Sequence, residues 1–112
     1  MIISDYSCSV SFGKTISVTF ENKGLFDVEG FYIKATNKSD QDIATISLVK
    51  GPNEYVTQKI RVGANYSRDF DYSNYGNIYQ IEVTPFRYEK VNERDKFAFC
   101  GNAKIIQKLQ NC

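Results

Sequence analysis

The sequence predicts an all-β domain, and three observations lead to that prediction. β-Branched and aromatic residues are frequent, with 8 Phe and 8 Tyr, whereas helix formers such as Ala and Leu are scarce. Several segments alternate apolar and polar residues with a period of two, which is typical of half-buried strands. Gly, Asn, Asp and Pro interrupt the chain at short, regular intervals. Seven to nine short strands of this kind indicate an immunoglobulin-like antiparallel β-sandwich that forms one domain over residues 1–112.

The first half of the chain shows the alternation most clearly. We expect strands at 14–21 and 31–36, separated by turn chemistry at 22–24, because Asn and Gly tolerate positive φ. Glu29-Gly30 lies just before the second strand, and a Gly there predicts a bend or bulge more simply than a functional site. The inward-facing residues of this half are expected to be Ile16, Val18, Phe20, Phe31 and Ile33.

The second half predicts further strands at 42–50, 55–62, 66–72 and 78–85, and then a hairpin from 86–91 and 96–100. In the second of these, Val56, Ile60 and Val62 are the candidate core positions.

The tail at 104–111 is ambiguous, since Ile105, Ile106 and Leu109 would share the face of a helix. We expect a strand, because a final edge strand would return Cys112 to the sheet.

Composition and charge exclude several classes of function. The net charge is +1, from 14 basic and 13 acidic residues that are interspersed, so no broad field attracts nucleic acid. His is absent, which excludes the usual general base and the triads that depend on it. No glycine-rich phosphate loop is present. We therefore expect neither an enzyme nor a cofactor.

No apolar run reaches the roughly 20 residues that a membrane span needs, and the N-terminus lacks the regions of a signal peptide. Strand-like sequence follows Met1 directly, which is compatible with a leader or anchor that once preceded it. A membrane link would therefore come only from such an N-terminal anchor.

Three cysteines, Cys8, Cys100 and Cys112, lie towards the two ends of the chain. This placement suggests a disulfide that ties the termini of a secreted or surface protein. Three pairings are open; Cys8 to Cys100 closes the larger ring of the two that involve Cys100 and would stabilise by about 4–5 kcal/mol in the loop-entropy model. We expect one disulfide involving Cys100. The alternatives are three reduced thiols or, with less support, a zinc site.

Two groups of side chains are candidate sites. Asp69 and Asp71 share a strand face and could bind Ca²⁺ with Asp5 or Glu82, although a solvated face explains them more simply, so we expect no metal site. An aromatic group could form a protein or glycan contact surface, and the alternative is that about half of it completes the core. Its members are Tyr66, Phe70, Tyr72 and Tyr75, with Tyr79 nearby.

Two sequons, at Asn37 and Asn65, fall in predicted loops and are candidate glycosylation sites. They agree with the cysteine placement, so we expect an extracellular or cell-surface location.

Four segments carry a resemblance that spans about Asp5 to Cys100. They are ISVTFENKG, EGFYIKATN, IYQIEVTP and FAFC, and they follow a Cys in the first strand. Together they resemble the soluble β-sandwich domain of archaeal type IV pilin-like surface proteins, in which the domain follows an N-terminal hydrophobic helix with a class III signal peptide. The chain departs from that family at Gly63-Ala64-Asn65, where a Pro-Gly-Glu turn is frequent.

The leading interpretation is a non-enzymatic extracellular or cell-surface module. The resemblance implies the head of a pilin-like protein that acts through contacts with other proteins or like subunits, and glycans are further candidate partners. The alternative is a secreted carbohydrate- or metal-binding accessory domain that uses its tyrosines or the face of Asp69 and Asp71.

Overall fold

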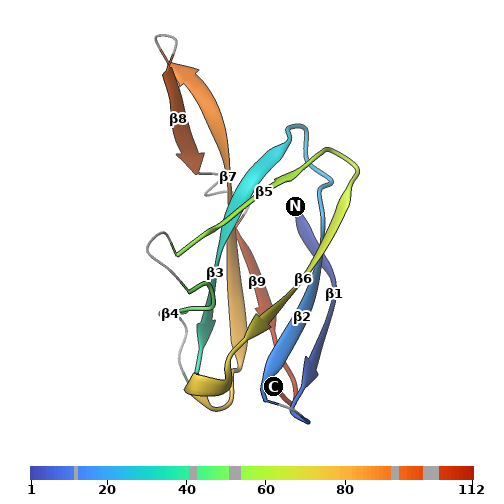
Figure 1. The fold of residues 1–112 in the computed structure, drawn as a ribbon, viewed down its shortest axis with the longest axis vertical. Coiled ribbons are helices and arrows are strands. Elements are labelled where there is room, and N and C mark those ends of the chain that lie inside the picture. Colours follow the sequence, from blue (N-terminus) through green and yellow to red (C-terminus); the bar gives the residue numbers. More distant parts are fainter. Residues whose placement is uncertain (12, 41–42, 51–53, 92–93, 100–103) are drawn as a thin grey trace.

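Two antiparallel sheets pack face to face in the computed structural model, which describes residues 1–11, 13–40, 43–50, 54–91, 94–99 and 104–112 (Figure 1). The molecule is elongated, with extents of 47 × 26 × 24 Å. The connections from β2 to β3 and from β6 to β7 cross between the sheets, as in immunoglobulin-like sandwiches. The predicted all-β sandwich is confirmed.

The smaller sheet has the strand order β1-β2-β6. Its strands are β1 (Ile2–Ser9), β2 (Thr15–Glu21) and β6 (Asn65–Asp71). The pairing of β1 with β2 shifts register between Ile3 and Asp5, whereas β2 and β6 pair without interruption. A 3-10 turn, η1 (Ser73–Tyr75), then leads from β6 towards the other sheet.

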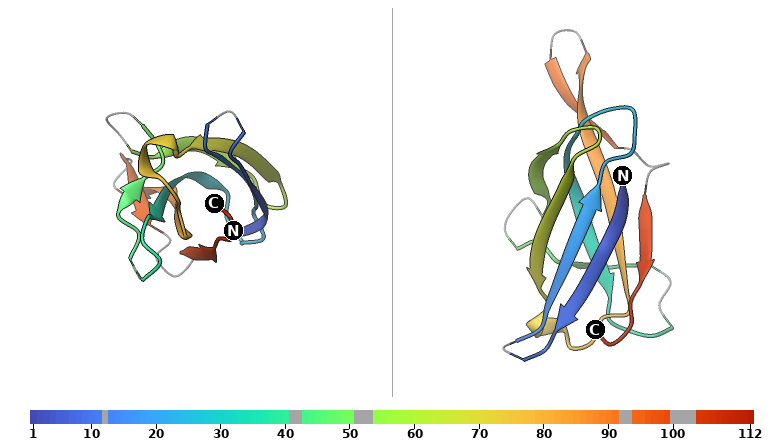
Figure 2. Two further views of the ribbon diagram at one scale, coloured as in Figure 1. Left: turned by 90° about the horizontal axis from the view of Figure 1, so that it is seen from below. Right: turned by 90° about the vertical axis from the view of Figure 1, so that its right-hand side faces the viewer.

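The larger sheet is built around β3 (Val28–Thr36) and β7 (Gln80–Val91). On one side, β3 pairs with β5 (Val56–Ile60) and with the short β4 (Ile46–Ser47). On the other side, β7 pairs with β9 (Ile105–Lys108) along its first half and with β8 (Arg94–Phe99) along its second half. The β7–β8 hairpin extends beyond the sandwich as an arm (Figures 1 and 2).

The core lies between the sheets and follows the predicted alternation. The residues expected to face inward are all fully buried: Ile16, Val18, Phe20, Phe31 and Ile33. Ile81 and Val83 of β7 belong to the same buried cluster. Val56 and Ile60 are also buried as predicted, but Val62 is 50% exposed. The prediction for Val62 is wrong because β5 ends at Ile60, so Val62 belongs to the turn before β6.

The strand predicted at 42–50 is wrong in extent. Among the described residues of this segment, Ile46 and Ser47 form the strand pairing with β3, and the N–H groups of Thr45 and Leu48 donate to the carbonyl oxygens of Ala35 and Ile33. Ile43 is 69% exposed, whereas Leu48 is buried in the core. The tail is a strand as predicted: β9 pairs with β7, Leu109 is buried, and Cys112 returns to the sandwich.

Glu29 and Gly30 form the predicted bulge. The register of β3 against β5 shifts between Val28 and Gly30. A side chain at Gly30 would collide with the carbonyl oxygen of Val56 and with the ring of Phe86. Glycine is therefore required here because two neighbours approach the backbone closely.

Asn22 joins two turns at one end of the sandwich. Its buried side chain donates to the carbonyl oxygens of Phe26 and Ile60, both at 2.9 Å, and accepts from the Gly24 N–H at 3.0 Å. Its backbone N–H donates to the carbonyl of Ala64. The turn predicted at 22–24 thus carries the chain from the smaller to the larger sheet and fastens the β5–β6 turn beside it.

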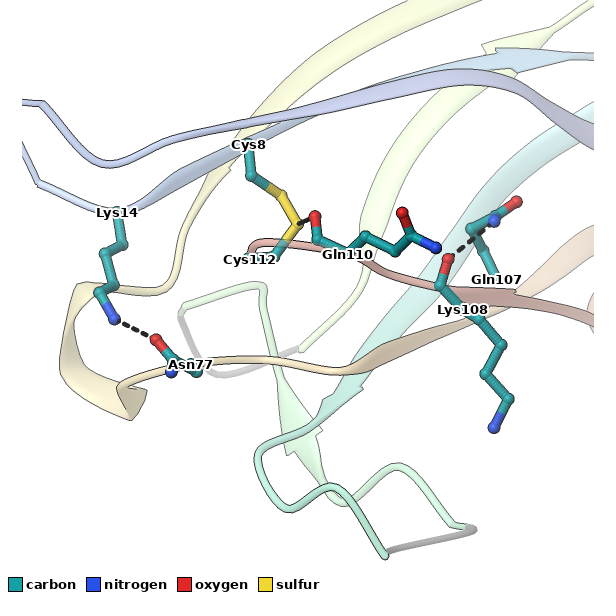
Figure 3. Close-up of a disulfide and its surroundings, with 7 residues drawn as sticks. All are labelled: Cys8, Lys14, Asn77, Gln107, Lys108, Gln110 and Cys112. Carbon is teal, nitrogen blue, oxygen red and sulfur yellow. Dashed lines mark hydrogen bonds between the residues drawn. A yellow bond between two sulfur atoms is a disulfide. The ribbon is translucent and has the colours of Figure 1, made fainter.

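A disulfide joins Cys8 of β1 to Cys112, with their Cα atoms 5.5 Å apart (Figure 3). It links an edge strand of the smaller sheet to the segment that follows β9, an edge strand of the larger sheet, and the two strands lie side by side (Figure 2). Nearby, Lys14 Nζ donates to Asn77 Oδ1 at 2.7 Å.

Cys100 lies outside the described residues. The prediction that it takes part in the intrachain disulfide is wrong, because its two candidate partners are joined to each other.

In the part of the chain that the structure describes, no helix has the length and apolar character needed to cross a membrane.

Candidate functional site

The outer face of the larger sheet is the candidate site. Alternation along β3 and β7 turns Phe31, Ile33, Ile81 and Val83 to the core, so the intervening residues point away from it. On β7 these outward residues are Gln80, Glu82, Thr84 and Phe86, and all but Thr84 are buried. An outward sheet face normally contacts water, so its burial here needs an explanation from the surrounding residues.

Three aromatic residues cover one half of this face. Phe86 is fully buried, and its ring lies 6.0 Å from that of Tyr32 and 5.4 Å from that of Tyr55. The rings of Tyr32 and Tyr55 are themselves 5.4 Å apart, and all three pairs meet edge to face. Such geometry is favourable for aromatic rings. The absence of a side chain at Gly30 lets Phe86 lie against the backbone of β3.

A cleft of about 380 Å³ lies beside the aromatic group. The outward residues of β3 and β7 form its floor, and residues from two other segments form its walls. Its lining residues are Tyr32, Lys34, Ile43, Ala44, Glu82, Thr84 and Lys104. A volume of this size is at the lower end of the range for small-molecule and side-chain binding sites.

Glu82 is the central charge of the cleft. Its side chain is 10% exposed and forms an ion pair with Lys104, with 3.1 Å between Glu82 Oε1 and Lys104 Nζ. Lys104 itself is 45% exposed, so solvent screens this pair in part. Lys34 is the direct partner of Glu82 on the neighbouring strand. Lys34, Glu82 and Lys104 all line the cleft, and the three side chains together carry a charge of +1.

The outer face of the smaller sheet has a different character. Ser17 Oγ donates to Asp69 Oδ1 at 2.6 Å, and the hydroxyl groups of Thr19 and Ser67 lie 2.9 Å apart. These bonds are exposed to solvent and join short polar side chains across the strands. This face is polar and open to solvent.

The candidate Ca²⁺ ligands are divided between the two sheets. Asp69 and Asp71 lie on the outer face of the smaller sheet, whereas Glu82 lies on that of the larger sheet, so the sandwich separates them. Asp71 accepts a hydrogen bond from the Ser73 N–H at 2.7 Å, which holds the pKa of that carboxyl below its ordinary value. Among the described residues, no group of three or more metal-ligating side chains gathers at one place.

The predicted aromatic contact surface is wrong for two of its four residues. Phe70 and Tyr72 are buried in the core, while Tyr66 and Tyr75 are half-buried and pack against it. The alternative that half of these residues complete the core is therefore correct. Burial raises the pKa of the Tyr72 hydroxyl, which has no hydrogen-bond partner among the described residues.

Both sequon asparagines are exposed. Asn37 follows β3 directly, in the predicted loop. Asn65 is instead the first residue of β6, opposite Glu21, so the loop prediction is wrong for it. It stands at the end of a strand because the preceding turn is complete at Gly63, whose φ is +84°.

A second surface feature lies at the end of the sandwich that Asn22 organises. Leu25 is 90% exposed and Phe26 is 61% exposed, with Val62 on the adjacent turn. The guanidinium of Arg87 lies 4.1 Å from the centroid of the Phe26 ring. This tip presents exposed apolar side chains, whereas the cleft is concave and combines apolar and charged groups, so the cleft is the better candidate for specific binding.

Sequence reasoning missed Tyr32, Lys34, Tyr55, Phe86 and Lys104 as site residues. A weak signal was present: aromatic and charged residues occupy the outward positions of the two central strands, where Ser and Thr occupy those of β2.

No family model, characterised protein or solved structure matches this chain. The case for a function rests on the residues and on their arrangement.

Proposed function

We propose that this chain is a non-enzymatic, extracellular or cell-surface binding module whose contacts are made by the outer face of the larger sheet. One observation carries the proposal. Glu82 is almost fully buried on an outward face, at the floor of a cleft of about 380 Å³.

Burial of a charged group supports binding over a purely structural role. Removing a carboxylate from water costs several kcal/mol, and an ion pair to a half-exposed lysine offsets only part of that cost. A hydrated face needs no such group, as the serines and threonines of the smaller sheet demonstrate. Costly polar groups in a concave site are typical of binding sites.

The disulfide supports an oxidising location. Cys8 and Cys112 form a bridge of a kind that persists in secreted and surface proteins and is rare in the cytosol. The exposed sequon at Asn37 agrees with that location. The absence of His from the sequence supports a non-enzymatic role.

The resemblance to archaeal pilin-like surface domains adds a context. In such a protein the sandwich would be a rigid head, and the outer face of its larger sheet would contact a like subunit or another surface protein. An accessory domain that binds carbohydrate remains the second candidate, favoured by the aromatic rings of Tyr32 and Tyr55 beside the cleft.

Site-specific photocrosslinking on intact source cells tests the proposal. A benzoylphenylalanine at Thr84, which lines the cleft, is compared with one at Ser7, which is exposed on the smaller sheet. We expect a crosslinked adduct of one defined mass from Thr84 and none from Ser7, formed while the cells remain closed. Equal crosslinking from both positions, no adduct from either, or an adduct that forms only after lysis would overturn the proposal.

A further inference from the structure

We propose that the cleft binds the carboxylate of an acidic side chain, presented by a partner protein. This inference rests on the proposed function and names the chemistry that the same site would recognise. It is argued from the charges of the cleft, the shape of its lining and the contrast between its two lysines.

The charges of the cleft are unbalanced. Lys104 is paired with Glu82 at 3.1 Å, whereas Lys34, directly opposite Glu82 on β3, has no ion pair among the described residues. Directly opposed residues on neighbouring antiparallel strands have Cβ atoms about 5 Å apart, so the side chain of Lys34 begins beside that of Glu82, and both line the cleft together with Lys104. A second carboxylate would complete an arrangement of two positive and two negative charges.

The lining favours a charge that is carried on an apolar stem. Ile43, Ala44 and the ring of Tyr32 supply apolar surface, and the hydroxyl of Thr84 supplies a hydrogen-bond group. A glutamate side chain matches this combination, because two methylene groups precede its carboxylate. Lysine binds a carboxylate as a point charge without demanding a planar, bidentate partner.

The two lysines would have different roles. Lys104 compensates the charge of the buried Glu82, while Lys34 is exposed and available to the ligand. Replacement of Lys34 should therefore affect binding far more than folding.

The test is an NMR titration of the whole chain with capped peptides. The probe is acetyl-Gly-Glu-Gly-amide, and acetyl-Gly-Gln-Gly-amide is its neutral match. The variants are Lys34→Met and, as a control on the same sheet, Lys108→Met, which removes a charge from β9 outside the cleft lining. A third probe, galacturonate, tests an acidic sugar.

We expect the glutamate peptide to shift the amide signals of Lys34, Glu82 and Thr84 saturably. Affinity should fall at least about 10-fold for the glutamine peptide and for Lys34→Met, and stay unchanged for Lys108→Met; loss of one ion pair of about 1.4 kcal/mol corresponds to that factor. Equal shifts from both peptides, or no effect of Lys34→Met, would overturn the inference. Saturable binding of galacturonate alone would also overturn it and would assign the cleft to an acidic sugar.

These results are distinguishable from failure of the proposed function. Crosslinking from Thr84 without any preference for glutamate would leave the outer face as a binding surface and reject only its carboxylate specificity. Glutamate binding without crosslinking at Thr84 would reject the cellular role and retain the chemistry.

Discussion

The strands of both sheets alternate inward and outward side chains, but the outward side chains of the two sheets differ in their exposure to solvent. On the smaller sheet, Ser17 and Thr19 are half-buried and Asp69 is exposed, and all three form hydrogen bonds across the strands at the solvent-facing surface. On the larger sheet, Phe86 is fully buried and Glu82 nearly so, beneath side chains from distant segments. The period of a strand thus predicts which residues point outward, but it does not predict whether those outward side chains are exposed to solvent.

The difference arises from the other segments of the chain that lie against each outer face. The smaller sheet has no segment laid across it in the described part of the chain, so short polar residues suffice there. The larger sheet receives Ile43 and Ala44 from the segment that follows β3, and Lys104 from the segment before β9. A concave, partly dry surface results, and such a surface can discriminate between ligands.

The largest effect should come from the bond that joins the two sheets. In the Cys8→Ser/Cys112→Ser variant we expect a loss of about 4–5 kcal/mol in the free energy of unfolding, because the bridge spans 104 residues of sequence. Urea unfolding measures this loss. The matched control, Cys100→Ser, should leave the bridge intact; if it abolishes the bridge instead, the Cys8–Cys112 pairing is incorrect.

The second prediction compares the faces directly. Phe86→Ala should cost about 3–4 kcal/mol, because it removes a buried ring that fills the space above Gly30. Thr19→Ala, at an outward position of the smaller sheet, should cost under about 1 kcal/mol. Chemical denaturation of both variants provides the measurement. Similar losses in the free energy of unfolding for the two variants would contradict the difference in burial between the two outer faces.

The third prediction concerns the charges. Glu82→Gln should leave the free energy of unfolding unchanged or raise it by up to about 1 kcal/mol, because the ion pair to the half-exposed Lys104 offsets only part of the cost of burying the carboxylate. Asp69→Asn should lower the free energy of unfolding slightly, since the charge-assisted hydrogen bond from Ser17 becomes a neutral one. Urea unfolding of both variants provides the measurement. A loss of more than about 1 kcal/mol in Glu82→Gln would contradict the incomplete compensation of that carboxylate.

The smallest effect should appear in acid. The pKa of Asp71 is lowered from 3.8 by the hydrogen bond from the Ser73 N–H, so this carboxylate contributes stability that is present above pH 3.8 and lost as pH falls through its folded pKa. Asp71→Asn should therefore be less stable than the parent at about pH 6, and the gap should narrow progressively as the pH falls below 3.8. A gap that widens in acid would reverse the assigned sign.

Much of the fold could be predicted because its signal is local. The residues Ile16, Val18, Phe20, Phe31 and Ile33 are bulky, apolar and spaced by two, and each is buried as expected. Val62 continues the same pattern but lies past the end of β5, where a turn overrides the alternation. The segment 42–50 has apolar residues without a strict period, and in its described part the hydrogen bonds to β3 come from residues 45–48.

The site could not be predicted because it depends on long-range contacts. Lys34 and Glu82 come together through the pairing of β3 with β7, and Lys104 arrives from a third segment. The disulfide has the same cause: three pairings are open in the sequence, and the return of the chain along β9 selects Cys8 with Cys112. The prediction of Phe70 and Tyr72 as surface residues is wrong because aromatic residues serve cores and surfaces equally well.

The Cys8–Cys112 bridge also determines how the domain would transmit tension. Residues 8 to 112 form a covalent ring, so a pull applied to the first and last residues runs through the first residues of β1 and the Sγ–Sγ bond. That load path includes β1 up to Cys8 but no strand of the larger sheet. Under tension, only the few residues outside the ring could extend in the oxidised domain. In the reduced domain, nearly the whole chain could unfold and extend. The oxidised domain would thus be an almost inextensible link, and the cleft would keep its shape while the chain is pulled.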